Sequence, residues 1–192
     1  MSHLRVDYLK LKQAAISLNC DDLGKAEQCF TACIPTSKIA FNRGVLRLWT
    51  HDADGAKAYF KEAFKLDKFL SVAAFYLGCL LIREEANEAA VEWFKEALIG
   101  FRGCVAFIDY SQLGMPFILH REDVQFNLAS ILLKAHGETS DLFINSIKSL
   151  SLESIRFLLS KERAMAIREP PWMDRRMIFD LLPNLEVQKP SR

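Results

Sequence analysis

Residues 41–101 read FNRGVLRLWTHDADGAKAYFKEAFKLDKFLSVAAFYLGCLLIREEANEAAVEWFKEALIGF, and this stretch is one block of sequence written twice. A shift of 34 positions superimposes five pairs, which are Phe41 on Phe75, Gly44 on Gly78, Ala56 on Ala90, Phe60 on Phe94 and Ala63 on Ala97. A glycine or alanine suits a close crossing of two helices, and a large aromatic side chain fills the groove between neighbouring helix pairs. The pattern therefore predicts a stack of helical hairpins.

The length of the period indicates the kind of repeat. A unit of 34 residues, with glycine in its first helix and alanine, phenylalanine and alanine in its second, is typical of tetratricopeptide repeats. We therefore predict an all-α superhelix of about four hairpins within a repeat domain of residues 1–168. Its repeats are expected at about 4–34, 37–68, 69–101 and 120–150. The first repeat lies only 30 positions before the second, because Ile34-Pro35-Thr36 makes a tight link.

The third and fourth repeats are separated by an insertion. Gly78 and its equivalent Ala129 are 51 residues apart, about seventeen more than one period. The excess lies at about 102–119, where two glycines and a proline exclude a regular helix and several β-branched and aromatic residues favour an extended chain. We expect a short hairpin or ordered loop there.

The chain after the fourth repeat is expected to cover the stack. Residues 151–168 predict an amphipathic capping helix, whose apolar positions are Ile155, Leu158, Leu159, Met165 and Ile167. Residues 169–192 begin with Pro170-Pro171 and are too apolar for a disordered tail. We expect this tail to pack in the concave groove of the superhelix, and the alternative is that it docks on a partner chain.

The composition excludes several classes of function. The net charge of +1 comes from 25 basic and 24 acidic residues, which indicates no nucleic-acid partner and no membrane-binding surface. No apolar run is long enough for direct insertion into a bilayer. The five cysteines lack paired C-x-x-C spacing, so a reducing, cytoplasmic location is expected, with Cys29 and Cys33 as small buried side chains. We expect a monomer.

The sequence shows no catalytic pattern. It contains no glycine-rich phosphate loop and no G-x-S-x-G motif. Its four histidines, His3, His51, His120 and His136, are dispersed along the chain. We therefore expect no enzyme activity, no cofactor and no metal site.

The insertion carries a more specific signal. Arg102-Gly103, Ile108-Asp109-Tyr110 and Leu113-Gly114 make the chain similar, from about residue 14 to 129, to the tetratricopeptide domain of the NADPH oxidase activators. The resemblance implies a non-catalytic adaptor that binds a GTP-loaded Rac-type GTPase and activates a membrane NADPH oxidase for superoxide production, with recruitment from the cytoplasm to the membrane. It also implies that the GTPase contacts the insertion and the loops between repeats, while the tail occupies the groove.

The resemblance also implies particular contact residues. Ser37, Asp67, Arg102 and Asp109 match the family's residue types, and Phe69, Gly103, Cys104 and Phe107 lie beside them. Three features depart from the phagocyte pattern. Phe69 replaces a histidine, Cys104 replaces an asparagine, and one more residue separates Arg102 from Asp109. Such changes can weaken binding or alter which GTPase is accepted.

Each of these residues also has a structural alternative. Asp67 and Ser37 can cap helices, Arg102 can pair with Asp109 to brace the insertion, and Phe69 can pack into the core.

Two other functions stay open at this point. One is a general scaffold that binds an acidic peptide in its groove. Asn42 and Arg43 suit such a ligand, whereas Tyr76 and Leu77 do not supply the matching basic set. The other is a repeat domain that no longer binds a GTPase and serves only for assembly.

Overall fold

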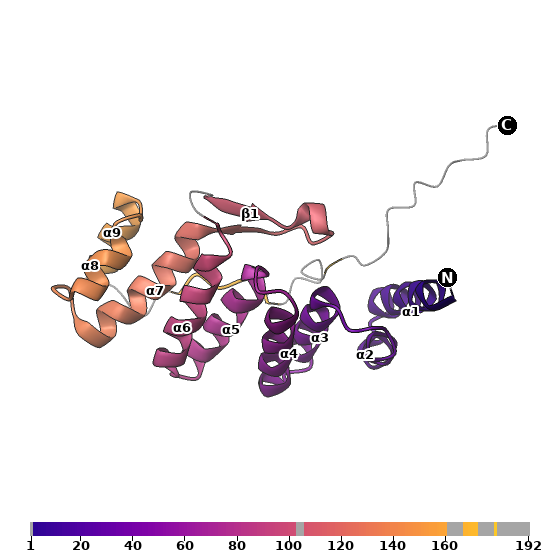
Figure 1. Ribbon diagram of the computed structural model, residues 1–192. Coiled ribbons are helices and arrows are strands. Elements are labelled where there is room, and N and C mark those ends of the chain that lie inside the picture. The colour runs from indigo at the N-terminus through magenta and orange to yellow at the C-terminus, as the bar shows by residue number, and fades with distance from the viewer. Residues whose placement is uncertain (1, 103–105, 161–166, 173–178, 180–192) are drawn as a thin grey trace.

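The computed structural model describes residues 2–102, 106–160, 167–172 and 179 of the chain (Figure 1). Within these residues nearly all regular structure is helical, which confirms the all-α prediction. The helices are α1 (Ser2–Asn19), α2 (Leu23–Thr31), α3 (Ser37–Trp49), α4 (Ala53–Leu66), α5 (Ser71–Arg83), α6 (Asn87–Ile99), α7 (Arg121–His136), α8 (Asp141–Ile147) and α9 (Leu152–Leu159).

The helices form antiparallel pairs that stack in chain order (Figure 1). The pairs are α1 with α2, α3 with α4, α5 with α6 and α7 with α8, and α4 and α6 each also contact the first helix of the next pair. Helices α1 to α8 therefore contact mainly their neighbours in the sequence, as expected for a solenoid, whereas α9 packs against α7 through Phe157 and Phe126.

The repeated glycines lie where the two helices of a pair cross. A Cβ atom added to Gly44 would be 2.6 Å from the Phe60 ring, and one added to Gly78 would be 2.7 Å from the Phe94 ring. Both phenylalanines are completely buried. Glycine at this position thus allows a large aromatic ring to fill the space between the helices.

The turns between paired helices repeat as well. Asp21, His51 and Glu85 all have a positive φ angle near 60°, and they are separated by the 30-residue and 34-residue shifts seen in the sequence. Side chains of Asp22 and Asp52 then cap α2 and α4 by accepting hydrogen bonds from backbone N–H groups. The same left-handed turn therefore closes three successive hairpins.

The insertion is a short β-hairpin. Strands β1 (Phe107–Asp109) and β2 (Ile118–His120) pair antiparallel, with Ile108 opposite Leu119. The 3₁₀-helix η1 (Ser111–Leu113) and Gly114, at φ 90°, make the turn between them. The hairpin expected from the interrupted repeat is confirmed.

The capping helix is shorter than predicted. The sequence favoured a helix over 151–168, but α9 ends at Leu159 and Ser160 is extended. Arg168 is not helical, and its backbone N–H donates to Asn127 Oδ1 while its carbonyl accepts from Asn127 Nδ2. Leu158 is buried as expected and Leu159 is half exposed, while Met165 lies outside the described residues.

The described part of the tail lies on the first helices of the pairs. Helices α3, α5 and α7 contribute Phe41, Asn42, Trp49, Tyr76, Cys79 and Asn127 to a surface that we call the first-helix face. Trp172 packs against Tyr76, and its carbonyl accepts a hydrogen bond from Trp49. Phe179 is buried beside Phe41. These contacts hold the described tail residues on the first-helix face. The rest of the predicted 169–192 tail lies outside the described residues, so its packing in the groove stays a prediction.

Truncation after Glu169 is expected to lower the melting temperature by about 5 to 10 °C. A large buried apolar side chain stabilises a fold by roughly 1.5 to 3 kcal/mol, and about 1 kcal/mol corresponds to 2–4 °C in a protein of this size. The truncation removes Trp172 and Phe179 from the first-helix face. Thermal unfolding followed by circular dichroism measures the change, and a melting curve identical to that of the full chain would contradict a stabilising tail.

No helix in the described ranges is both long and apolar enough to cross a membrane.

Candidate protein-interaction site

The predicted site residues lie at the start of α3, in the linkers that follow α4 and α6, and in the inserted hairpin. We call this surface the loop edge, and it contains Ser37, Asp67, Phe69, Arg102, Phe107 and Asp109. Gly103 and Cys104, which were also predicted to contact a partner, lie outside the described residues. The loop edge is built from three separate parts of the chain, so its geometry depends on how these parts are anchored.

The α4–α5 linker presents an aromatic side chain to solvent. Asp67 follows the last residue of α4, and its Oδ1 accepts a hydrogen bond of 2.9 Å from the Phe69 N–H. This turn buries Leu70 and leaves Phe69 50% exposed. The alternative that Phe69 packs into the core is therefore wrong. Asp67 shapes the linker instead of capping the start of α5, which begins after Leu70.

The cation of the loop edge stacks on this aromatic ring. The Arg102 guanidinium carbon lies 3.8 Å from the centre of the Phe69 ring, a cation–π contact. Arg102 has a φ angle of 43°, which turns the chain sharply after α6. Within the described residues Arg102 forms no ion pair with Asp109. The bracing pair considered from the sequence is therefore absent there, and the Arg102 side chain lies exposed on Phe69.

Asp109 is an oriented anion at the end of β1. Its Oδ1 accepts a hydrogen bond of 2.8 Å from the Ser111 N–H. Hydrogen bonds from the Ser111 side chain and backbone hold the pKa of Asp109 below its usual value. The carboxylate is thus charged at neutral pH and fixed by the turn of the hairpin.

The hairpin is anchored to the beginnings of α3 and α5. The Val72 N–H donates a hydrogen bond of 3.0 Å to the Tyr110 hydroxyl, and burial raises the pKa of Tyr110. Lys38 Nζ donates to the Leu113 carbonyl at 3.2 Å. Ser37 is the first residue of α3 but not its cap, because the Thr36 side chain accepts the capping hydrogen bond from Ile39. The alternative that Ser37 caps the helix is therefore wrong.

Some of the predicted site residues contact each other directly, and others are connected only through residues that lie between them. Asp67, Phe69 and Arg102 form one contacting cluster, whereas Ser37 and Asp109 are linked through the hairpin turn and Lys38. Phe107 is half exposed and lies against the His120 ring across the hairpin. Sequence reasoning missed the anchoring roles of Lys38 and Tyr110, although Tyr110 belonged to a motif that carried the resemblance.

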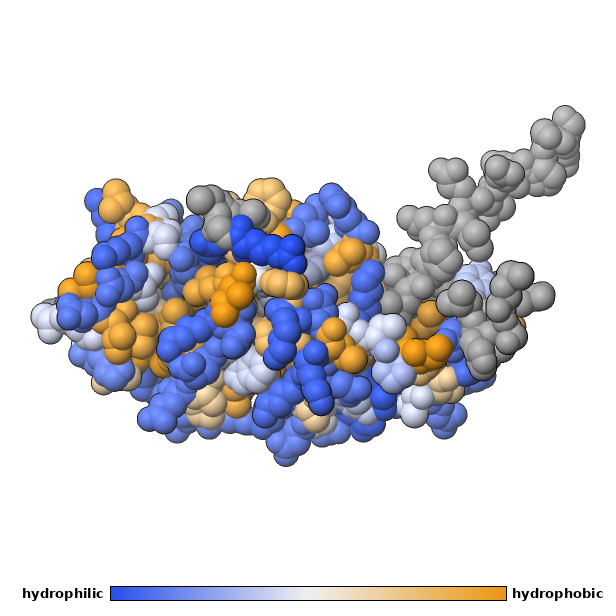
Figure 2. Space-filling view, viewed as in Figure 1, coloured by the Kyte–Doolittle hydropathy of each residue, from blue (hydrophilic) through white to orange (hydrophobic). Residues whose placement is uncertain are grey.

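The surface around the hairpin and the end of α6 mixes apolar and polar side chains (Figure 2). Half-exposed or exposed apolar residues on the linkers and hairpin are Leu66, Phe69, Ile99, Phe107, Leu113 and Ile118. Scattered apolar groups beside oriented charges are common in protein–protein contacts. The loop edge is therefore a candidate protein-interaction surface.

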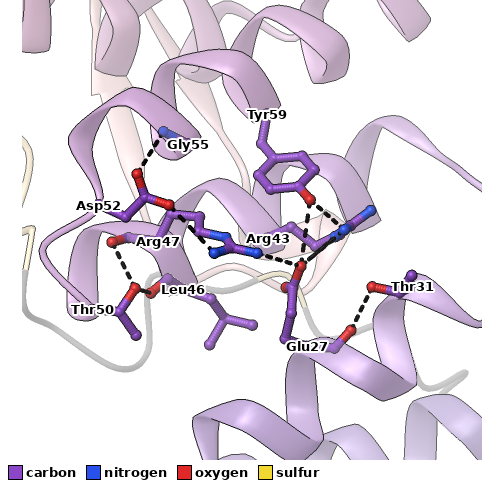
Figure 3. Close-up of polar contacts among 9 residues, drawn as sticks. All are labelled: Glu27, Thr31, Arg43, Leu46, Arg47, Thr50, Asp52, Gly55 and Tyr59. Carbon is purple, nitrogen blue, oxygen red and sulfur yellow. Dashed lines mark hydrogen bonds and ion pairs between the residues drawn. The ribbon is translucent and has the colours of Figure 1, made fainter.

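Polar groups on α3 that suit an acidic peptide are already occupied. Figure 3 shows Arg43 beside Glu27 and Tyr59, with Arg43 Nη2 2.8 Å from Glu27 Oε1. Arg47 contacts the same carboxylate at 3.3 Å. Asn42 bonds both backbone groups of Phe179. These contacts argue against the scaffold alternative, because a peptide would have to displace the chain's own groups.

The described residues supply no metal centre, since no three His, Cys, Asp or Glu side chains lie close enough together to hold an ion. Cys33 is buried and its Sγ donates to the Cys29 carbonyl at 3.3 Å. Burial raises the pKa of Cys33, which makes its thiol less reactive. This agrees with a packing role for Cys33.

The fold and the loop edge define a helical-repeat protein with an inserted hairpin and a candidate protein-interaction surface. No family model matches the chain. Neutrophil cytosol factor 2 of Homo sapiens is 36% identical over 100 residues, which are 52% of this chain and 19% of that protein. NADPH oxidase activator 1 of Rattus norvegicus is 33% identical over 109 residues, 56% of this chain and 24% of that protein.

A third relative, NADPH oxidase activator of Dictyostelium discoideum, is 33% identical over 102 residues, 52% of this chain and 16% of that protein. The chain is thus related in sequence to the NADPH oxidase activators over about half its length. It spans a quarter or less of the length of these relatives.

Proposed function

We propose that the protein is a non-catalytic adaptor that binds a GTP-loaded Rac-type GTPase through its loop edge and activates a membrane NADPH oxidase. The relatives are named as oxidase activators or a neutrophil cytosol factor, which supports the oxidase-related role. In this proposal the adaptor is cytoplasmic and is recruited to the membrane oxidase subunit with the GTPase.

The observation that carries the GTPase assignment is the preorganised pair of opposite charges on the loop edge. Arg102 is held against Phe69, and Asp109 is held by Ser111. Charged side chains that are oriented before binding lose less conformational entropy when they form interface hydrogen bonds. The cation and the anion do not neutralise each other in the free protein, so both can pair with groups of a partner.

Phe69 is compatible with this assignment despite departing from the phagocyte pattern. A histidine at position 69 could offer a hydrogen bond, whereas phenylalanine offers an apolar face and a platform for Arg102. We propose that binding depends on the charge of Arg102 more than on a polar group at position 69.

Isothermal titration calorimetry with the GTP-loaded and GDP-loaded forms of Rac tests the proposal. We expect affinity in the micromolar range for the GTP form and at least about tenfold weaker binding of the GDP form, since a small and mostly polar contact is implied. Equal affinity for both forms would contradict an effector role. Absence of heat with every Rac-type GTPase tried would remove the GTPase assignment.

A further inference from the structure

We propose that Phe179 is a positioning residue for the β-hairpin. Through Phe179, the tail on the first-helix face controls the conformation of the hairpin and therefore of the loop edge. Phe179 lies 70 residues after Asp109 in the sequence, yet it contacts the residue next to Asp109. The coupling to partner binding rests on the proposed function. The coupling between tail and hairpin is independent of any partner.

The backbone of Phe179 is held at a defined place on α3. Asn42 Nδ2 donates to the Phe179 carbonyl at 2.9 Å, and the Phe179 N–H donates to Asn42 Oδ1 at 2.8 Å. Asn42 is fully buried, so these hydrogen bonds are shielded from water. A paired amide contact of this kind fixes both the position and the direction of the chain, because both donors and both acceptors must match.

The Phe179 side chain fills the space between α3 and the hairpin. Its ring is 1% exposed and lies 5.2 Å from the Phe41 ring and 6.1 Å from the Tyr110 ring, with an edge-on geometry to both. The Lys38 ammonium lies 5.6 Å from the centre of the same ring.

The groups that Phe179 contacts are those that anchor the hairpin. Tyr110 accepts the hydrogen bond from Val72, and its own N–H donates to the Phe117 carbonyl at 2.9 Å. Lys38 donates to the Leu113 carbonyl. Removing the Phe179 ring leaves a cavity beside Tyr110 and Lys38. Both side chains can then move more, and their hydrogen bonds hold the hairpin less firmly. Asp109 directly precedes Tyr110, and its orientation depends on the same turn.

A matched tail residue lacks these contacts. Trp172 packs on Tyr76, lies 5.8 Å from the Arg83 guanidinium and accepts a hydrogen bond from Trp49 through its carbonyl. None of these groups belongs to the hairpin. Both aromatic residues stabilise the tail on the first-helix face, but only Phe179 connects it to the loop edge in the described contacts.

The coupling must act in both directions. If a docked tail favours the hairpin conformation that binds a partner, then partner binding must favour the docked tail by the same factor. Release of the tail, for example by another protein that binds Phe179, would then weaken partner binding. The tail would act as a built-in positive regulator of the loop edge.

Hydrogen exchange measured by mass spectrometry on the full chain, with the variants Phe179→Ala and Trp172→Ala, tests the inference. We expect Phe179→Ala to increase exchange over residues 106–120 at least about tenfold, and Trp172→Ala to lower overall stability while leaving exchange of the hairpin near that of the native chain. Equal hairpin exchange in the two variants, after correction for their stabilities, would overturn the coupling.

Calorimetry on the same proteins tests the consequence for binding. We expect Phe179→Ala to weaken binding of GTP-loaded Rac about 5-fold to 50-fold, within the usual range of coupling between sites, and Trp172→Ala to change it less than twofold. If Phe179→Ala binds GTP-loaded Rac with the same affinity as the native chain, the tail does not control binding at the loop edge. If the native chain itself binds no GTPase, the proposed function fails, and hydrogen exchange still decides the coupling of tail and hairpin. If Phe179→Ala does not fold, Phe179→Leu provides the smaller perturbation for both measurements.

Discussion

Replacement of Arg102 by glutamate is expected to weaken binding of the GTP-loaded GTPase at least about 100-fold while leaving the helical fold intact. Placing a like charge where an opposite charge was bound costs several kcal/mol, and each 1.4 kcal/mol changes affinity about tenfold. A contact of micromolar affinity would then fall below detection. Calorimetry measures binding, and circular dichroism monitors the helical content.

The fold should tolerate this substitution because Arg102 is exposed in the free protein. Its described contact is the stack on Phe69, and an exposed cation–π contact contributes about 1 kcal/mol or less. Glutamate also faces the same backbone requirement at φ 43° as arginine does. The structural cost should therefore be small compared with the cost to binding.

Lys95→Glu is the matched control for the charge reversal. Lys95 lies on α6, the helix that precedes Arg102, and pairs only with Glu92 in the described contacts. This variant is expected to bind the GTPase with native affinity. The double variant Arg102→Asp with Asp109→Arg should not restore binding, because the two side chains do not pair in the structure. Native affinity of Arg102→Glu, or rescue by the double variant, would contradict the assignment.

Replacement of Phe60 by alanine is expected to destabilise the protein by about 3 to 5 kcal/mol. Phe60 is fully buried, touches the backbone at Gly44 and packs 5.2 Å from both Phe41 and Tyr76. Truncation of such a side chain removes apolar contact and leaves a cavity that rigid helices fill poorly. Unfolding in urea, followed by circular dichroism, measures the difference in the free energy of unfolding.

Phe157→Ala is the control for this loss. Phe157 lies on α9, is 50% exposed and contacts the Phe126 ring at 6.1 Å. We expect its removal to cost about 1 kcal/mol or less, since surface positions away from the core have small effects. If Phe60→Ala and Phe157→Ala lower the free energy of unfolding by similar amounts, the close helix crossing at Phe60 does not contribute more to stability than a surface contact.

The stack of helix pairs and the position of the insertion could be predicted from the sequence, because the residues that specify the helix pairs lie close together in the chain and recur with a fixed period. Gly44 and Phe60 meet within one hairpin, and Gly78 and Phe94 meet in the same way 34 positions later. The interruption of this period, together with turn residues, was enough to locate the β-hairpin. The division of the chain into a repeat domain and a tail, and the roles of the predicted contact residues, stay predictions.

Other features were decided only by the tertiary structure, because they depend on residues far apart in the chain. Helix α9 ends at Leu159, short of the predicted end at 168, and Arg168 pairs both of its backbone groups with Asn127, 41 residues away. Local periodicity contains no information about such a contact, since an apolar pattern predicts a buried face without specifying its partner. The position of Arg168 is thus fixed by a side chain that is distant in the sequence.

The loop edge shows the same limit. The sequence alone placed Phe69 directly after the second predicted repeat and Arg102 directly after the third, but did not indicate that the ring would face solvent and support the guanidinium. Nor could it predict that Phe179 would contact Tyr110. Repeat sequences specify the contacts that recur within and between neighbouring hairpins. Contacts made once, by linkers, an insertion and a returning tail, are determined by the space that the completed stack leaves for them.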